Sequence, residues 1–122
     1  MNTSVATKLS ADFRQSDWHP YENQLIFKKS DLMKVPSGAF GIYGLWFRKR
    51  CIYVGKAEKQ SIAQRLEQHW KGSHNPNLAD WIIAMGSRLS VGYLVVADQS
   101  EISDLEKRYI KKFQPLTNRM LK

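Results

Sequence analysis

Five residues near the middle of the chain have side chains that could act together on a phosphate group. They are Tyr43, Tyr53, Lys56, Arg65 and His69. An arginine can donate two parallel hydrogen bonds to a phosphate, which a lysine does less well. A tyrosine has a pKa of about 10 and becomes a useful base only where nearby positive charge lowers that pKa. Lys56 and Arg65 could supply this charge, provided that the fold brings them to the tyrosines.

Two strand-like runs, residues 41–47 and 51–54, carry the tyrosines and predict a β-hairpin. Both runs are rich in aromatic and β-branched residues, and only a basic tripeptide separates them. A two-residue loop would pair Phe47 with Arg50 and place the two tyrosines on opposite faces. Such loops favour Asn-Gly or a glycine at positive φ, which this sequence lacks, so we expect an odd-numbered loop of three residues. The tyrosines would then lie diagonally opposite each other on one face.

A helix after the hairpin positions the arginine and the histidine. Ser61 can cap this helix, Gln64 completes a capping box, and Gly72 ends it shortly after residue 70. Its apolar stripe consists of Ile62, Leu66 and Trp70. Arg65 lies on the border of this stripe and His69 follows one turn later, so we expect Arg65 to emerge between helix and sheet. The alternative is an ordinary amphipathic helix with a solvated arginine.

Glu106 is a carboxylate inside the apolar stripe of the last predicted helix, residues 101–113, which Ser100 would cap. The stripe consists of Ile102, Leu105, Tyr109, Ile110 and Phe113. No residue one turn away on either side is basic. A buried carboxylate without a partner costs several kcal/mol, so a distant group must compensate. An ion pair with Arg65 and a bound metal ion are the two alternatives.

Taken in order, these residues resemble the GIY-YIG nuclease family. The resemblance rests on Gly41-Ile42-Tyr43, Tyr53-Val54-Gly55, Lys56, Arg65, His69, Glu106 and Asn118, and it extends from about residue 35 to the C-terminus. The second motif has valine where the family name has isoleucine. An isolated triplet would be weak evidence, whereas the ordered set is specific.

The resemblance implies a metal-dependent endonuclease that hydrolyses DNA phosphodiester bonds. Tyr43 would be the general base, with His69 as the alternative base or a phosphate contact. Tyr53 would orient the water or the phosphate, and Glu106 would hold one Mg²⁺ or Mn²⁺ ion that keeps several waters. The implied catalytic set is Tyr43, Tyr53, Lys56, Arg65, His69, Glu106 and Asn118. In this set, Lys56 supports the phenolate or the phosphate and Asn118 supports the site; the alternative for Asn118 is a turn-stabilising contact.

The net charge of +8 and the isoelectric point of about 9.7 favour a polyanionic partner. Residues 41–71 hold seven Lys/Arg against two acids and residues 107–122 hold six against none, whereas residues 72–106 hold one against five. The expected nucleic-acid contacts are Arg48, Lys49, Lys56, Arg65 and Lys71. The alternative is a solvated basic surface, and strong salt dependence of binding would distinguish the two.

Length and composition predict a single soluble α/β domain. We expect a small GIY-YIG-type sandwich with a three-stranded, mainly antiparallel sheet in the order β-β-α-α-β-α. A helix that Asn77 caps, that runs through Met85 and that Gly86 ends, and a central third strand over residues 89–97, complete it. Residues 1–34 would form an extension that packs on the 35–122 domain, with a strand at residues 24–28 and a helical turn at Ser30-Asp31.

A single cysteine, Cys51, and the lack of a long apolar run favour a cytoplasmic protein without a membrane span. Two other function classes stay open: an inactive nucleic-acid-binding module on the same fold, and a small basic structural protein that binds RNA without metal. No zinc-finger or helix-turn-helix pattern is present to select a sequence. Recognition of double-stranded or branched DNA would therefore need the N-terminal segment, a homodimer or an accessory partner.

Overall fold

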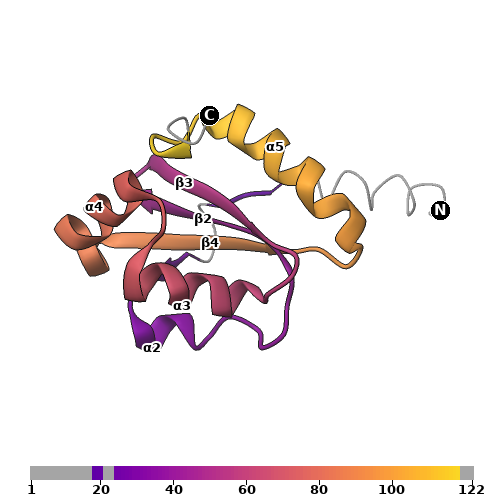
Figure 1. The fold of residues 1–122 in the computed structure, drawn as a ribbon, viewed down its shortest axis with the longest axis horizontal. Coiled ribbons are helices and arrows are strands. Elements are labelled where there is room, and N and C mark those ends of the chain that lie inside the picture. Colours follow the sequence, from indigo (N-terminus) through magenta and orange to yellow (C-terminus); the bar gives the residue numbers. More distant parts are fainter. Residues whose placement is uncertain (1–17, 21–23, 119–122) are drawn as a thin grey trace.

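An antiparallel sheet in the order β1-β4-β2-β3 forms the centre of the computed structural model, which describes residues 18–20 and 24–118 (Figure 1). Its strands are β1 (Leu25–Ile26), β2 (Gly41–Phe47), β3 (Arg50–Ala57) and β4 (Leu89–Val95). The predicted α/β class, the antiparallel sheet and the element order are confirmed. The stretch at residues 24–28 adds β1 as a short fourth strand, which leaves β4 and β2 in the interior and β3 at an edge.

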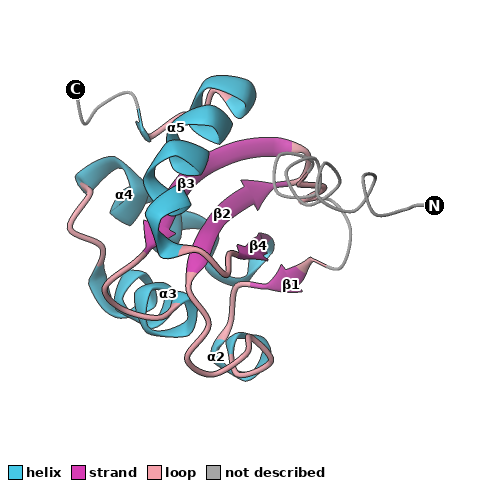
Figure 2. Ribbon diagram, turned by 90° about the vertical axis from the view of Figure 1, so that its right-hand side faces the viewer, coloured by secondary structure: helices cyan, strands magenta, loops and turns pink. Residues whose placement is uncertain are grey.

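Helices cover both faces of this sheet, as Figures 1 and 2 show. On one face lie α2 (Lys29–Leu32), α3 (Ile62–Gly72) and α4 (Pro76–Met85), and on the other lies α5 (Ile102–Phe113). Two short 3-10 turns, η1 (Gly86–Arg88) and η2 (Gln99–Glu101), precede β4 and α5. Because both faces are covered, β2 is buried along nearly its whole length, which explains why this strand is apolar throughout.

The helix ends follow local capping chemistry. Ser61 and Gln64 form the predicted capping box of α3, with hydrogen bonds of 3.1 and 2.9 Å. Two other predicted caps are wrong. Asn75, not Asn77, caps α4 because Pro76 occupies the first helical position, where its missing N–H costs nothing. Asp98 caps the turn before α5, because its Oδ1 accepts the N–H of Ser100 at 3.0 Å, and Ser100 therefore does not provide the cap.

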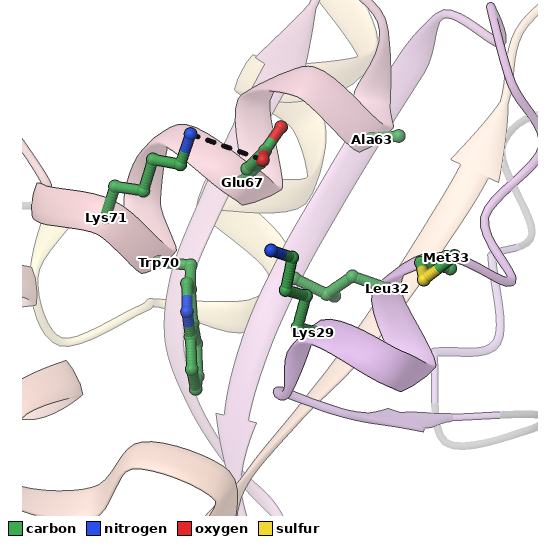
Figure 3. Close-up of a pocket in the computed structure, with 7 residues that line it drawn as sticks. All are labelled: Lys29, Leu32, Met33, Ala63, Glu67, Trp70 and Lys71. Atoms are coloured by element: carbon green, nitrogen blue, oxygen red, sulfur yellow. Dashed lines mark ion pairs between the residues drawn. The ribbon is translucent and has the colours of Figure 1, made fainter.

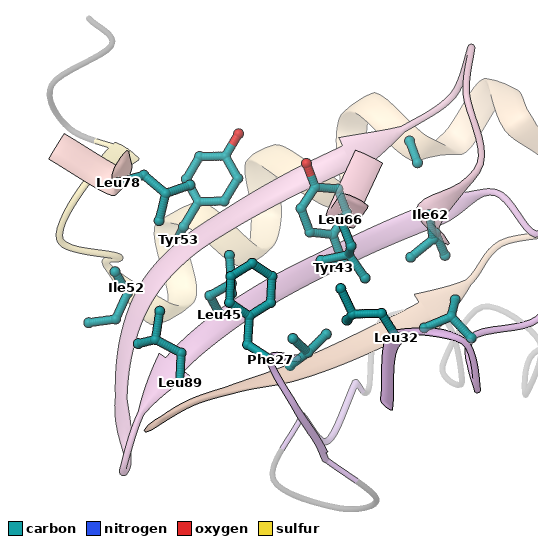
Figure 4. Packing of buried hydrophobic residues seen from close by; sticks show 13 residues of the cluster. Phe27, Leu32, Tyr43, Leu45, Ile52, Tyr53, Ile62, Leu66, Leu78 and Leu89 are labelled. Carbon is teal, nitrogen blue, oxygen red and sulfur yellow. The ribbon is translucent and has the colours of Figure 1, made fainter. Parts of the chain in front are cut away.

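The β2–β3 hairpin differs from its prediction and still puts the two tyrosines on one face. Phe47 pairs with Arg50, so the loop has two residues, and Arg48 adopts the left-handed φ of 58° that this tight turn needs. The register then shifts between Leu45 and Trp46, where Ile52 is an extra residue on β3. This β-bulge reverses the alternation once. The predicted three-residue loop is therefore wrong, whereas the predicted shared face is confirmed (Figure 4).

Two apolar clusters hold the layers together. The larger lies between the sheet and α2, α3 and α4, and Figure 4 shows its labelled members, among them Phe27, Tyr43 and Leu66. The smaller lies under α5, where Trp18 packs edge-on against Trp46 and Tyr109 at centroid distances of 5.6 and 5.2 Å. Of the proposed extension, Trp18 and Phe27 thus pack into the core. Residues 1–17 and 21–23 lie outside the described residues, and the boundary at residue 34 stays a prediction.

The segment that follows α5 runs along the free edge of β3. Leu116 N–H donates to the Cys51 carbonyl at 3.2 Å, and Thr117 N–H donates to the Ile52 carbonyl at 3.0 Å. The Thr117 hydroxyl donates to the same Ile52 oxygen at 2.7 Å. These contacts satisfy backbone groups that a bulged edge strand would otherwise leave unpaired. Separately, none of the helices in the described ranges is long and apolar enough to cross a membrane.

Candidate active site

A hollow of about 330 Å³ opens at the edge strand β3, where α3 and α5 approach from the two faces of the sheet. Its lining consists of Tyr53, Lys56, Glu58, Lys59, Gln60, Arg65 and Glu106. Strand β3 contributes Tyr53 and Lys56, helix α3 contributes Arg65, and helix α5 contributes Glu106. Residues from three separate elements, all predicted from sequence as catalytic, thus meet in one place.

Tyr43 and His69 form a buried pair next to this hollow. The Tyr43 hydroxyl and Nε2 of His69 lie 2.9 Å apart, and the two side chains are 0% and 1% exposed. On its other side, Nδ1 of His69 lies 2.9 Å from the Ser73 hydroxyl. The ring of Tyr53 packs against His69 at a centroid distance of 5.1 Å and against Tyr43 at 6.1 Å. Tyr53 therefore links the buried pair to the hollow.

Burial sets the protonation of these three groups. It raises the pKa of Tyr43 well above its usual value, and the neighbouring Tyr53 adds to this while the positive charge of Arg65 opposes it. Burial also raises the pKa of Tyr53, again against the charge of Arg65. For His69, burial together with Arg65 and His74 lowers the pKa to about 3. At neutral pH the pair is therefore a neutral phenol beside a neutral imidazole.

Lys56 is held at the rim of the hollow by two partners. Its ammonium group donates to the Ser103 hydroxyl of α5 at 2.8 Å and forms an ion pair with Glu58 at 3.0 Å. The Ser103 hydroxyl in turn donates to the other oxygen of Glu58 at 3.3 Å. These three contacts close a triangle and fix the lysine between β3 and α5. The hydrogen bond of Glu58 with Lys56 lowers the pKa of this carboxyl, so Glu58 is ionised at neutral pH.

Arg65 reaches the hollow from the opposite wall. Its Nη1 donates to Oε1 of Gln68 at 2.6 Å, and the side chain is partly buried. Its charge acts on both tyrosine hydroxyls and on His69, as their pKa directions show. Within the described residues Arg65 has no carboxylate ion partner. The predicted position between helix and sheet is confirmed, and the guanidinium remains available for an anion.

Glu106 has no ion pair or hydrogen bond with any described residue, so the predicted alternative of an ion pair with Arg65 is not found. Burial raises the pKa of Glu106, the charge of Lys56 opposes the shift and the charge of Glu58 adds to it. In the described ranges no three His, Cys, Asp or Glu residues cluster as a metal cage. One partly buried, unpaired carboxylate facing a polar hollow fits a single Mg²⁺ or Mn²⁺ ion that keeps most of its waters.

Asn118 braces the strand that carries the site. Its Oδ1 accepts the N–H of Val54 at 2.8 Å, and its Nδ2 donates to the carbonyl of the same residue at 2.8 Å. The side-chain amide thus replaces the backbone of a neighbouring strand at the position between Tyr53 and Gly55. Asn118 lies outside the lining of the hollow. Its contacts are those of a positioning residue.

Residues 45–87 of the sequence match a family model described as the GIY-YIG catalytic domain. The chain contains a GIY-YIG family domain. The match includes Tyr53, Lys56, Arg65 and His69. Tyr43, Glu106 and Asn118 lie outside the matched range, and their placement beside the others comes from the structure. No curated protein matches the chain.

Three basic residues predicted to contact nucleic acid lie away from the hollow of the GIY-YIG domain. Arg48 and Lys49 form the hairpin tip, and the strand between Arg50 and Lys56 spans about 20 Å. Lys71 lies in the last turn of α3 and pairs with Glu67 at 3.4 Å. Figure 3 shows these two residues at a different cavity, about 260 Å³, between α2 and α3. This second cavity is mainly apolar and contains none of the predicted catalytic residues.

The sequence did not predict four residues of the GIY-YIG site: Glu58, Lys59 and Gln60 in the lining of the hollow, and Ser103, which binds Lys56. Glu58 lies two residues after Lys56, and Ser103 lies one turn before Lys107 on α5. Alternation along β3 could have indicated that Glu58 follows Lys56 on one side of the strand. Nothing local to Ser103 could have indicated its contact with Lys56, because 47 positions separate the two.

Proposed function

We propose that this protein is a metal-dependent endonuclease that hydrolyses DNA phosphodiester bonds. The observation that carries the proposal is the meeting of Arg65 and Glu106 in one hollow, from helices on opposite faces of the sheet. Among the residues that the structure describes, the guanidinium of Arg65 has no carboxylate partner and the carboxylate of Glu106 forms no ion pair with a basic residue. A phosphate bound by Arg65 and a divalent cation bound by Glu106 would give each of these side chains a partner of opposite charge.

Arg65 and Lys56 would bind the phosphodiester. The guanidinium of Arg65 can donate two hydrogen bonds to the non-bridging oxygens of the scissile phosphate, where negative charge grows during attack. Lys56 approaches from the opposite rim, held by Ser103 and Glu58 at 2.8 and 3.0 Å. Because these partners limit its motion, the ammonium group is oriented before the substrate arrives. DNA is the proposed substrate, in double-stranded or branched form.

Glu106 would hold one Mg²⁺ or Mn²⁺ ion. When bound, such an ion supplies charge stabilisation for the phosphoryl and leaving oxygens. Glu106 contributes a negative ligand from α5, and partial burial without an ion-pair partner among the described residues makes the carboxylate favour a cation over water alone. A single carboxylate is sufficient because Mg²⁺ retains waters and takes further oxygens from the phosphate.

The tyrosine–histidine pair would manage the proton of the attacking water. Tyr43 would be the general base and would pass its own proton to Nε2 of His69, which lies 2.9 Å away. Tyr43 is fully buried, so the water would have to reach it from the hollow. Its path would pass Tyr53, which lines the hollow and whose ring packs against Tyr43. Arg65 favours the phenolate form of both tyrosines, and this opposes the effect of burial.

The test is cleavage of supercoiled plasmid and of branched DNA with Mg²⁺, with Mn²⁺ and with EDTA. The wild type should nick or linearise DNA only with metal, and Glu106→Ala and Arg65→Ala should each lower the rate at least about 100-fold. Glu67→Ala and Arg88→Ala are matched controls, because they remove an exposed carboxylate and an exposed guanidinium outside the hollow. Both controls should cleave at the wild-type rate, and all variants should keep the wild-type circular dichroism spectrum.

Metal binding can be measured without activity. Mn²⁺ that binds the folded state raises the melting temperature, and the rise should disappear in Glu106→Gln and persist in Glu67→Gln. Failure of the wild type to cleave any substrate, with DNA binding that is indifferent to metal, would contradict the nuclease proposal. That outcome would leave a nucleic-acid-binding module on a nuclease-type fold.

A further inference from the structure

The outer surface of α5 carries two basic rows that differ in where they lie. Successive positions four residues apart fall on one side of a helix, about 6 Å apart along its axis. Ser103, Lys107 and Lys111 form the first row, and this row starts at the hollow, where Ser103 binds Lys56 at 2.8 Å. Arg108 and Lys112 form the second row, on the far flank of the helix.

The second row is engaged with the protein itself. The ammonium group of Lys112 lies 5.9 Å from the centroid of the Tyr109 ring and 5.6 Å from that of Phe113. Both rings belong to the cluster beneath α5, which also contains Trp18. Arg108 and Lys112 therefore lie toward the Trp18 flank of α5, whereas the hollow lies on the Glu106 flank.

The first row is positive and exposed, and nothing in the described part of the chain neutralises it. Lys107 and Lys111 are exposed and form no ion pair with a described acid, Asp104 on the same helix included. By contrast, Lys71 pairs with Glu67 at 3.4 Å. Lys107 is also close enough to Glu106 for its charge to act on that carboxyl. An exposed row of unpaired lysines that leads away from the hollow is suited to a chain of phosphates.

We propose that Lys107 and Lys111 bind the phosphate backbone of DNA beside the scissile phosphate, so that the strand leaves the hollow along α5. This inference rests on the proposed function for its choice of DNA. Backbone contacts of this kind fix the position of the duplex and carry no sequence information. The row replaces the hairpin tip as the expected backbone contact, because Arg48 and Lys49 lie at the other end of β3 from Lys56.

The experiment compares two double variants that remove the same charge from the two flanks. Binding of a labelled DNA duplex of about 20 base pairs is measured in EDTA between about 50 and 200 mM KCl, so that no cleavage occurs. For K107A/K111A the slope of log affinity against log salt should fall by about 1.8, and affinity at the lowest salt should fall at least tenfold. For R108A/K112A the slope should change by less than about 0.5.

Equal changes in the two double variants, or none in K107A/K111A, would overturn the proposed row. If K107A/K111A lost affinity for an RNA duplex but not for the DNA duplex, the choice of DNA would be overturned. Because the measurement needs no catalysis, its outcome is separable from that of the nuclease proposal. A slope that falls in K107A/K111A while the wild type cleaves nothing supports the row and contradicts the nuclease. Cleavage by the wild type together with an unchanged salt slope in K107A/K111A would support the nuclease and contradict the row.

Discussion

The hydroxyl of Tyr43 lies 2.9 Å from Nε2 of His69, and neither side chain reaches bulk solvent. The imidazole is held on its other nitrogen by Ser73 at 2.9 Å, so its ring orientation is fixed from both ends. The Ser73 hydroxyl also accepts the N–H of Asn75 at 3.2 Å. A phenol and an imidazole arranged in this way can exchange one proton without moving heavy atoms, which suits the proposed base.

This burial makes stability depend on pH in a defined direction. The pKa of His69 is lowered to about 3 when folded, against about 6.5 when unfolded. Between these values only the unfolded chain binds the proton, so the free energy of unfolding falls as pH falls from about 6.5 toward 3. From pH 7 to pH 5 the wild type should lose about 2 kcal/mol that His69→Gln does not lose. Urea unfolding at the two pH values measures this, with His74→Gln as a control that keeps the larger causes of the His69 shift, burial and Arg65.

Gly55 should resist substitution because the two tyrosine rings occupy the space beside it. A Cβ at this position would lie 2.6 Å from the Tyr43 hydroxyl and 2.7 Å from Cε2 of Tyr53. Gly55→Ala should therefore displace both rings, lower the free energy of unfolding by about 1–3 kcal/mol and abolish cleavage. Gly72→Ala is the matched control, since open space surrounds a Cβ there. Equal urea midpoints and equal nicking rates for the two variants would contradict this role of Gly55.

Glu58 should weaken DNA binding, because it places a negative charge in the hollow. It pairs with Lys56 at 3.0 Å and so competes with phosphate for the same ammonium group. Removing a like charge about 4 Å from a phosphate is worth about 1 kcal/mol in water, so Glu58→Gln should bind duplex DNA about fivefold more tightly. Glu67→Gln removes an equal charge outside the hollow and should have a smaller effect. Fluorescence anisotropy in EDTA measures both, and a weaker-binding Glu58→Gln would show that Glu58 mainly positions the lysine.

Asn118 should control the edge of β3. Asn118→Ala removes two hydrogen bonds of 2.8 Å to Val54 and leaves buried backbone groups unpaired, which should cost about 1–3 kcal/mol of stability. Hydrogen exchange at the Val54 amide should accelerate more than the global change requires, because the edge opens locally. Asn77→Ala is the control, since that side chain makes no hydrogen bond within the described residues. Unchanged protection of Val54 would show that the strand holds its edge without Asn118.

Features of this fold that depend on neighbouring residues were predictable from the sequence. Ser61 and Gln64 lie three positions apart, and their capping box fixed the start of α3 and with it the place of Arg65. The third strand and the last helix followed from their apolar patterns. The cap of α4 follows a local rule too, because proline is common at the first helical position and the asparagine directly before Pro76 is then the cap. The predicted cap, Asn77, lies two residues too late.

Features that depend on distant partners were not predictable. The loop has two residues because Arg48 accepts a φ that arginine rarely adopts. The bulge at Ile52 is stabilised by Thr117, 65 positions away. The burial of Tyr43 and the position of Tyr53 at the hollow depend on which strand lies at the edge. The two tyrosines share one face of the sheet, but Tyr43 lies on the interior strand β2 and Tyr53 on the edge strand β3.

The extra residue at Ile52 decides whether Tyr43 and Tyr53 lie on the same face of the sheet, because side chains alternate between the faces along each strand. Deleting this residue together with its bulge would leave Tyr53 opposite Leu45, on the face of Tyr43. Regular pairing that kept every residue would instead place Tyr53 opposite Gly44, on the other face. Related chains can therefore differ by one residue in this hairpin and still present the same two rings, provided that a bulge is gained or lost with it. A comparison that aligns such hairpins by length alone would match the wrong residues.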